Sequence, residues 1–504
     1  SLLPIDFLYR SARFTPDAVA VDAPSGILTY AELTARVDAL ASAFQALDPA
    51  PDSRVGICAH NTVAHLLALL ATLAAGKVWV PLNPRESRSE LDAKVAATAP
   101  GIVVVDEDCL DLVGMPPDAK RVLGQGSAAA DSVTGLIEAH RGRRPERIER
   151  SLDSAQAIKF TGGSSGRPKG VLQPCRAWVA GAVSMMHGWG LGPDDGYLVA
   201  APLTHGTSCY VTPILAAGGR LVFLEGRTTP AAVLEALETR HVTLSFVPPT
   251  LIYTMQQELA GRPFRAPRLR HLIYGAAPMP PEKVRQALDI FGPVIGSNYG
   301  QTEAPQVITV MTARDYAGGT RLASCGRPGL LARVAVMDRD GRILPPGEEG
   351  EIVVRGDLLM LGYLDMPEAT AETLRDGWLH TGDVGVFDEA GYLTIKDRLR
   401  DVIITGGFNV YPNDVEAALV SHPAVHEAVV FGVPDDKWGE AVHAAVTLRP
   451  GVQAAPEAII NHVRAALGGV KTPKRVHILA AIPRNPVGKV VRREVREAVP
   501  GAGP

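Results

Sequence analysis

The sequence predicts an α/β protein with a large N-terminal domain of layered mixed or parallel sheets and helices, and a small α+β C-terminal domain. Its 504 residues are enough for two or more domains with a large buried core. Short β-rich runs alternate with helical patterns of ten or more residues, which is typical of crossover connections between parallel strands. After residue 320 the runs become shorter and are separated by Gly and Pro turns, as in antiparallel strands.

The alternation begins near residue 30, where Leu33, Val37, Leu40 and Phe44 recur at helical spacing. The next expected elements are strands at 54–58, 77–81 and 101–106, with helices at 62–75 and about 89–98 between them. The pattern then resumes with strands at 221–225, 243–247 and 271–275, each followed by a helix that begins at Pro230, Pro249 or Pro281.

Two further segments, about 116–150 and the final hundred residues, differ from this alternating pattern. Between about 116 and 150 the chain is polar and ends in the basic run RGRRPERIER, which we interpret as a solvated excursion. A bound polyanion is the alternative interpretation of that run. The final hundred residues combine predicted helices at 413–421 and 456–467 with predicted strands at 427–433 and 441–448.

The composition argues against a nucleic-acid-binding protein, a membrane-spanning protein and a disulfide-rich protein. The chain has 46% hydrophobic and 21% charged residues, as ordinary globular proteins do. Its formal charge of -4 gives no reason to expect nucleic acid as a partner. The longest apolar segment, 66–75, is about half the length of a transmembrane helix. Scattered cysteines without metal-type spacing favour a reducing, cytoplasmic location (Cys58, Cys109, Cys175, Cys209 and Cys325).

The run FTGGSSGRPKG, residues 160–170, is rich in glycine and serine. Consecutive backbone N–H groups in such a turn can converge on an anion, and serine hydroxyls and a lysine add donors. It is not the common GxxxxGK[ST] phosphate loop, because Lys169 is followed by Gly170. Taken alone, the run is equally compatible with a linker.

Four other motifs follow it in order: YGQTEA (299–304), GWLHTGD (377–383), DRLRDVIITGGFNVYP (397–412) and PRNPVGK (483–489). Together the five motifs resemble the adenylate-forming superfamily of acyl- and aryl-CoA ligases, peptide-synthetase adenylation domains and luciferases. The resemblance spans nearly the whole chain and is strongest to stand-alone bacterial fatty-acyl or aryl-acid CoA ligases. It implies an ATP- and acid-binding domain at 1–397, a hinge at 398–400 and a mobile domain at 401–504.

In such enzymes a carboxylate attacks the α-phosphate of ATP, expels pyrophosphate and forms an acyl-adenylate. A thiol then displaces AMP. The first step needs positive charge and positioning more than a protein nucleophile. The resemblance therefore implies ATP, Mg²⁺ and coenzyme A as cosubstrates and cofactor, with a small carboxylic acid as substrate.

The resemblance also assigns the nucleotide contacts. Glu303 resembles the carboxylate that holds Mg²⁺, an ion that prefers oxygen ligands. Asp383 resembles the acid that accepts hydrogen bonds from both ribose hydroxyls, and Arg398 a ribose and phosphate contact. Lys489 resembles the catalytic lysine that bridges the carboxylate and the α-phosphate. The other implied contacts are the phosphate cradle of Thr161, Ser164, Ser165 and Lys169, the adenine slot of Ala276, Ala277, Pro278, Asn298 and Tyr299, and Thr302 at the α-phosphate. Position 162 is Gly where the family commonly has Ser.

For the second step, His205 in PLTHG resembles the histidine beside the acid carboxylate and the thiol entrance. Gly406 and Gly407 match the glycine pair along the pantetheine path. Arg85 and Trp438 match CoA-nucleotide contacts of an aryl-CoA ligase, although another basic position used there is Thr472 here. Arg400 occupies the pivot, where relatives usually have Lys or Asp.

The acid pocket is expected to include His205, Phe246, Gly275 and Gly300, with Met185 or Met186 as a further wall. These small, apolar or aromatic residues favour an aryl or medium-chain monocarboxylic acid without a second charge. Two alternatives stay open: an adenylating enzyme that loads a carrier-protein thiol, and a catalytically inactive nucleotide-binding regulatory protein. A homodimer is compatible with the sequence.

Overall fold

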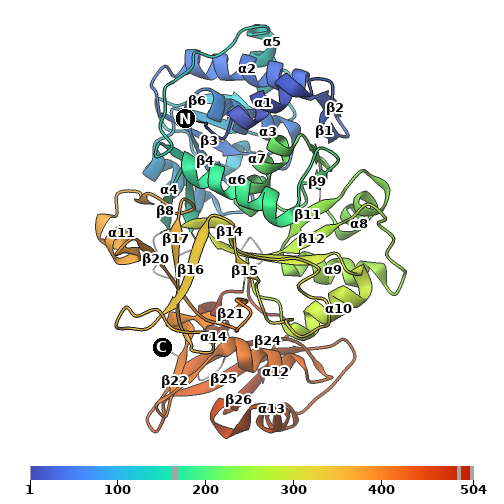
Figure 1. Ribbon diagram of the computed structural model, residues 1–504, viewed down its shortest axis with the longest axis vertical. Helices are drawn as coiled ribbons and strands as arrows, with labels where there is room; N and C mark the ends of the chain where they lie inside the picture. The colour runs from blue at the N-terminus through green and yellow to red at the C-terminus, as the bar shows by residue number, and fades with distance from the viewer. Residues whose placement is uncertain (1, 162–167, 227, 485–489, 500–504) are drawn as a thin grey trace.

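The computed structural model describes residues 2–161, 168–226, 228–484 and 490–499. Its sheets are stacked along the long axis of the molecule, with the N-terminal elements at one end and the C-terminal elements at the other (Figure 1). The mixed α/β architecture agrees with the predicted fold class.

One large sheet has the strand order β18-β8-β7-β4-β3-β5-β6. Its centre is parallel, whereas β7 and β8 form an antiparallel hairpin around the glycine-rich run. The strands are β3 (Arg54–Cys58), β4 (Val78–Leu82), β5 (Ile102–Val105), β6 (Lys120–Leu123), β7 (Ala155–Thr161), β8 (Lys169–Pro174) and β18 (Gly362–Tyr363). The accompanying helices are α1 (Asp6–Phe14), α2 (Tyr30–Leu47), α3 (Val63–Ala74), α4 (Arg88–Thr98), η1 (Glu107–Leu112) and α5 (Val133–Ala139).

A second large sheet has the order β15-β14-β13-β12-β11-β9-β10-β1-β2 and is parallel from β13 through β1. Its strands are β1 (Val19–Ala23), β2 (Gly26–Thr29), β9 (Gly196–Leu198), β10 (Arg220–Val222), β11 (Leu244–Val247), β12 (His271–Tyr274), β13 (Ile295–Gln301), β14 (Ala304–Met311) and β15 (Arg327–Pro328). The helices of this part are α6 (Cys175–Trp189), η2 (Leu203–Thr207), α7 (Ser208–Ala217), α8 (Pro230–Thr239), α9 (Pro249–Leu259) and α10 (Pro281–Phe291).

The later chain is mainly antiparallel, as the shorter runs predicted, although β26 pairs in parallel with β25. One sheet contains β16 (Ala332–Met337), β17 (Gly350–Gly356), β19 (Leu374–Arg375), β20 (Trp378–Phe387) and β21 (Leu393–Arg398), with α11 (Pro367–Thr373) beside it. The last sheet contains β22 (Ile403–Thr405), β23 (Phe408–Val410), β24 (Val425–Asp435), β25 (Gly439–Leu448) and β26 (Arg475–Ile478). It follows η3 (Leu399–Asp401) and is accompanied by α12 (Pro412–Val420), α13 (Pro456–Lys471) and α14 (Arg492–Glu497).

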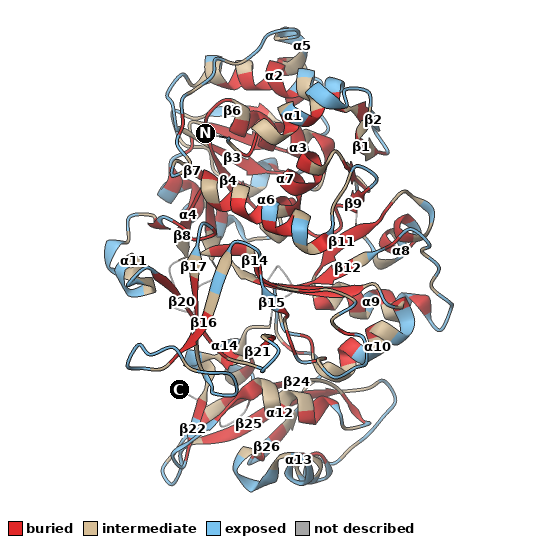
Figure 2. Cartoon of the chain, in the orientation of Figure 1, coloured by how far each residue is buried: buried red, intermediate tan, exposed pale blue. Residues whose placement is uncertain are grey.

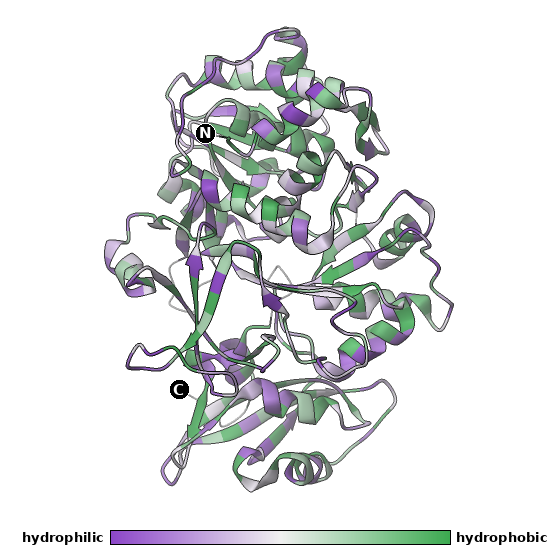
Figure 3. Cartoon of the chain, viewed as in Figure 1, coloured by the Kyte–Doolittle hydropathy of each residue, from purple (hydrophilic) through white to green (hydrophobic). Residues whose placement is uncertain are grey.

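The two large sheets share one hydrophobic core, whereas the sheet of β22–β26 has a separate core around Val415, Val430 and Ile459. Most strand residues are buried, and exposed residues lie mainly on loops and outer helix faces (Figure 2). The hydropathy colouring follows the same division, with hydrophobic residues along the strands (Figure 3). Among the described helices, none combines the length and the apolarity needed to cross a membrane.

The expectation of a solvated excursion at 116–150 is only partly right. Within it, β6 pairs in parallel with β5, and Val122 and Val133 are buried in the core. Most of the arginines of the basic run are exposed, but Arg150 is buried and forms an ion pair with Asp52. Short, half-polar elements at a sheet edge carry too little hydrophobic pattern to be seen in sequence.

A buried histidine predicts acid sensitivity of the fold. His65 in α3 is 1% exposed, its Nδ1 lies 3.0 Å from the carbonyl oxygen of His60, and burial lowers its pKa from 6.5 to about 4. Between those values the unfolded chain binds a proton that the folded chain does not, so the free energy of unfolding falls as pH drops from 6.5 to 4. His65→Leu should make this dependence shallower by up to about 1.4 kcal/mol per pH unit, as measured by urea unfolding. An unchanged slope in the variant would contradict this linkage.

Candidate active site

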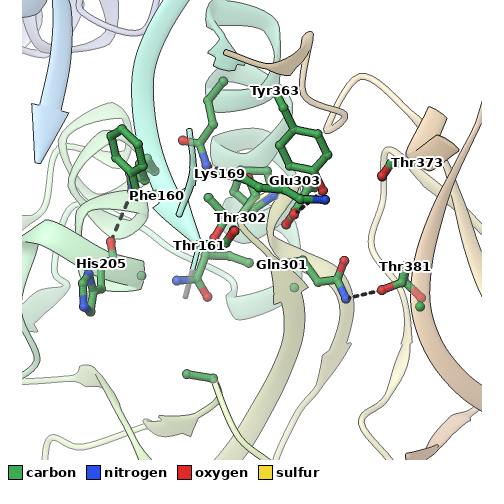
Figure 4. A pocket seen from close by; sticks show the side chains of 18 of the residues that line it. Phe160, Thr161, Lys169, His205, Gln301, Thr302, Glu303, Tyr363, Thr373 and Thr381 are labelled. Carbon is green, nitrogen blue, oxygen red and sulfur yellow. Dashed lines mark hydrogen bonds between the residues drawn. The ribbon is translucent and has the colours of Figure 1, made fainter. Parts of the chain in front are cut away.

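A cavity of about 920 Å³ lies where β7, β8, β13, η2 and β20 approach one another. Figure 4 shows Lys169, Tyr363 and Glu303 gathered in it, with His205 on the side away from Thr381. The sequence-predicted residues that line it are Thr161, Lys169, His205, Phe246, Ala276, Asn298, Gly300, Thr302, Glu303, Arg398 and Arg400. The structure thus brings together residues that are separated by more than two hundred positions in the sequence.

Three predicted residues, Ser164, Ser165 and Lys489, lie outside the described residues. Others adjoin the cavity without being part of its lining. Gly275 is packed so closely that a Cβ there would lie 2.8 Å from the Phe246 ring. Ala277 and Pro278 directly follow Ala276, which lines the cavity and has a φ of 68°.

The end of the cavity that is predicted to hold the phosphates is formed by the β7–β8 hairpin. Thr161 ends β7 and is the register partner of Lys169, the first residue of β8, so both ends of the glycine-rich run meet at the cavity. Lys169 Nζ lies 4.7 Å from the centre of the Tyr363 ring. The Tyr363 hydroxyl donates to Glu303 Oε1 at 2.7 Å. A cation and a carboxylate are therefore held by one aromatic side chain.

Thr302 and Glu303 form the turn between β13 and β14. The side chain of Gln173 donates to the backbone oxygen of Thr302 at 2.8 Å, which ties this turn to β8. The Glu303 carboxylate and the Thr302 hydroxyl both belong to cavity-lining residues. Oxygen donors of this kind fit a hard cation such as Mg²⁺.

Asp383 lies in β20 and is 4% exposed. Its Oδ2 accepts hydrogen bonds from the Tyr299 hydroxyl at 2.5 Å and from Gln301 Nε2 at 2.7 Å. Its Oδ1 forms an ion pair with Arg398 Nε at 2.9 Å. Burial and the nearby carboxylate raise the pKa of Tyr299, so its hydroxyl stays protonated and donates. Three predicted nucleotide-site residues, Tyr299, Asp383 and Arg398, thus share one hydrogen-bonded group with Gln301 at the edge of the cavity.

Asp383→Asn should raise the KM for ATP by about 10- to 100-fold, because hydrogen bonds to a charged acceptor are stronger than those to a neutral amide. The KM for the acid should change much less. Steady-state kinetics with each substrate varied in turn checks this. Tyr299→Phe is the control, since it removes one buttress of Asp383 and leaves the carboxylate in place. Equal increases in both KM values in Asp383→Asn would contradict a nucleotide-specific role.

His205 lies in η2, where its φ of -119° and ψ of -141° interrupt the helical turn. Asn83 Nδ2 is 3.4 Å from His205 Nε2. Burial, together with the cations Lys159, Lys94 and Arg85, lowers the pKa of His205 to about 4. The imidazole is therefore neutral at physiological pH and can orient a ligand without carrying charge.

The predicted acid pocket is more polar than the sequence indicated. Asn298 Nδ2 donates to the Tyr210 hydroxyl at 3.0 Å and to Gln306 Oε1 at 2.9 Å. Asn298 thus lies beside Tyr210, whose ring stacks on Phe246 with a centroid separation of 5.5 Å. The lining also includes residues that the motifs did not single out, among them Lys159, Cys209 and Gln306. Met185 is buried in the core, and neither it nor Met186 is part of the described lining.

The residues predicted to contact CoA are arranged in two places. Gly406 and Gly407 form the β22–β23 turn with φ of 57° and 84°, and a Cβ on Gly406 would lie 3.0 Å from the Trp438 ring. Lys474, which the motifs did not indicate, places its Nζ 5.1 Å from the centre of the Trp438 ring. Arg85 follows β4, where its backbone N–H donates to Asn83 Oδ1. None of the four predicted CoA contacts is among the described residues lining the cavity.

Comparison with known proteins identifies the family. The family model described as AMP-binding enzyme matches residues 8–364, and the model described as AMP-binding enzyme C-terminal domain matches residues 414–489. The chain belongs to the AMP-binding enzyme family. The resemblance to adenylate-forming enzymes is thereby confirmed, together with the fold class.

This AMP-binding enzyme aligns with similar proteins over nearly its whole length. It is 36% identical over 490 residues to a feruloyl-CoA synthase of an Amycolatopsis species, with 97% of each chain covered. It is 33% identical to a medium/long-chain fatty-acid–CoA ligase of Mycobacterium tuberculosis, covering 93% of this chain and 85% of the relative. Among solved structures, the amide bond synthetase McbA of Marinactinospora thermotolerans matches with a TM-score of 0.87 and 33% identity, over 98% of this chain and 99% of that one.

Proposed function

We propose that this AMP-binding enzyme is an acid–thiol ligase that converts a carboxylic acid and ATP to an acyl-adenylate and pyrophosphate, then transfers the acyl group to coenzyme A with release of AMP. One observation carries the proposal. A single cavity contains the phosphate-site residues Thr161, Lys169 and Glu303 together with His205 and Phe246 of the predicted acid pocket. A carboxylate bound by His205 and Phe246 can therefore reach the α-phosphate of an ATP bound by Thr161, Lys169 and Glu303.

In the first step, Lys169 and the loop that it ends hold the β- and γ-phosphates, and Asp383 holds the ribose. The neutral His205 and the Phe246 wall orient the acid. Two anionic groups must approach each other, so Lys489 neutralises the carboxylate and α-phosphate oxygens as the bond forms. Glu303 would hold Mg²⁺, which supplies charge neutralisation at the phosphates when bound.

In the second step, the thiol approaches along Gly406 and Gly407, which admit the pantetheine arm because they carry no side chain. The CoA nucleotide lies against Trp438 and Arg85. Since these residues do not line the cavity in the present arrangement, the unit 401–504 reorients about the hinge at 398–400 relative to the unit 1–397. We further propose that the enzyme is cytoplasmic and forms a homodimer, which size-exclusion chromatography with light scattering tests.

Coenzyme A is the proposed acyl acceptor, and there is one alternative class of acceptor. Coenzyme A is favoured by the glycine pair beside Trp438 and by the CoA ligases among the relatives. A carrier-protein thiol or an amine is the alternative acceptor. The similarity to an amide bond synthetase and to a fatty acid–[acyl-carrier-protein] ligase of Streptomyces coeruleorubidus supports this alternative.

Acid-dependent ATP–pyrophosphate exchange tests the adenylation step without an acceptor. A panel of aryl and C6–C12 carboxylic acids should include acids that drive exchange of labelled pyrophosphate into ATP. Exchange should be absent when the acid is omitted. ATP binding without exchange for every acid would favour an inactive nucleotide-binding protein.

A further inference from the structure

Lys159 is a lysine buried in the wall of the proposed acid pocket. It lies in β7, two residues before Thr161, and is 7% exposed. Its Nζ donates to Ser208 Oγ at 2.8 Å and to the carbonyl oxygen of His205 at 3.3 Å. The same atom lies 5.0 Å from the Trp79 ring centre and 5.5 Å from that of Trp178. The ammonium group is thus held in place by neutral groups.

No aspartate or glutamate of the described residues forms an ion pair with Lys159. Lys94, another lysine of the same cavity, does have such a partner, since it forms an ion pair with Glu86. Burying an ammonium group without a counter-ion is costly, and hydroxyl, carbonyl and aromatic partners offset only part of that cost. Burial accordingly lowers the pKa of Lys159. A ligand anion would supply the charge that the protein lacks here.

The position of Lys159 places it away from the phosphates. Side chains two residues apart on a strand share a face at a spacing of about 6.6 Å. Thr161 marks the phosphate end of β7, so Lys159 lies one repeat deeper, toward Trp79 and Trp178. It lines the cavity together with Cys209, whose Sγ is 3.9 Å from Nζ, and with Phe246. Its ammonium therefore belongs to the acyl side of the site.

From this geometry we propose, resting on the proposed function, that Lys159 binds a second carboxylate of the acid substrate. The preferred substrates are then dicarboxylic acids, of which one carboxylate is adenylated and the other pairs with Lys159. This replaces the expectation of an uncharged acyl tail, which was based on Phe246 and the neighbouring glycines without Lys159. Gln306 and Asn298, which line the same cavity, add hydrogen-bonding capacity for such an acid.

The test uses pairs of acids in which one carboxylate is replaced by an isopropyl group of similar shape. Examples are benzene-1,4-dicarboxylate with 4-isopropylbenzoate, and adipate with 6-methylheptanoate. Acid-dependent pyrophosphate exchange gives kcat/KM for each member. The wild-type enzyme should prefer the dicarboxylate in at least one pair, and Lys159→Met should lower kcat/KM for that dicarboxylate by about 10- to 100-fold. The isopropyl acid should lose nothing, and the KM for ATP should stay the same.

Lys94→Met is the matched control, because it removes a cation from the same cavity that already has a protein partner. It should leave the preference within each pair unchanged. The melting temperature distinguishes a binding role of Lys159 from a structural role. Lys159→Met should keep or raise the melting temperature, because it removes an unpaired buried charge. Three results would overturn the proposal: preference for the isopropyl acid in every pair, equal losses for both members in Lys159→Met, or a lower melting temperature with parallel losses. If no acid of either kind drives exchange, the proposed function itself fails.

Discussion

Lys489→Ala should lower the rate of adenylation by about 1,000-fold, because it removes a positive charge that acts mainly on the transition state. Pyrophosphate release from ATP and the acid measures this step. Thioester formation from supplied acyl-adenylate should be largely spared, since that step has no pyrophosphate to expel. The two half reactions are therefore expected to separate in this variant.

A second lysine of the C-terminal unit serves as the control. Lys471 is paired with Asp414 at 3.0 Å and is not among the described residues that line the cavity, so Lys471→Ala should leave adenylation unchanged. Equal losses of adenylation and thioester formation in Lys489→Ala would show that Lys489 supports the fold or both steps, and not adenylation alone.

Arg400→Pro should leave much of the adenylation activity and reduce transfer to CoA by about 100-fold, the size of effect expected when reacting groups are misplaced by about 1 Å. Arg400 is the central residue of η3, which connects β21 to β22, and it lines the cavity. A hinge works by absorbing a change in φ and ψ, and proline fixes φ near -65°. The variant should therefore hold one arrangement of the two units.

The contacts around η3 explain why a single arrangement is well defined. Arg492 of α14 forms ion pairs with Asp401 at 3.3 Å and with Glu416 at 2.8 Å, and it lies 3.8 Å from Asp397 of β21. Arg400→Ala removes the side chain but keeps φ free, so it should retain CoA transfer. Loss of transfer in both variants would assign the effect to the arginine side chain, and normal transfer in Arg400→Pro would exclude this residue as the pivot.

Much of the fold could be predicted because its strands are short, apolar and bounded by turns. The run 54–58 is β3, 271–275 contains β12, and 413–421 differs from α12 by one residue at each end. Two of the elements that were missed, β6 and α5, are short and partly exposed. Their burial depends on β5 and α2, which lie elsewhere in the chain, so no local pattern reveals them.

The site residues divide in the same way, into those that a local motif reveals and those whose position depends on distant segments. Thr161, Lys169 and Glu303 could be found because each belongs to a contiguous motif. Lys159 could not, since a lysine within a strand normally faces solvent, and its burial comes from Trp79 and Trp178 in other segments. The pairing of Asn298 with Gln306 is likewise a product of the β13–β14 turn.

We propose that one chain adenylates a carboxylic acid and passes the acyl group to coenzyme A. The most direct measurement incubates the enzyme with ATP, Mg²⁺ and a panel of mono- and dicarboxylic acids, with and without CoA, and quantifies the products by mass spectrometry. For the accepted acids we expect acyl-CoA and AMP in equal amounts with CoA, and only enzyme-bound acyl-adenylate without it. Formation of ADP, or turnover that does not depend on CoA, would contradict the claim.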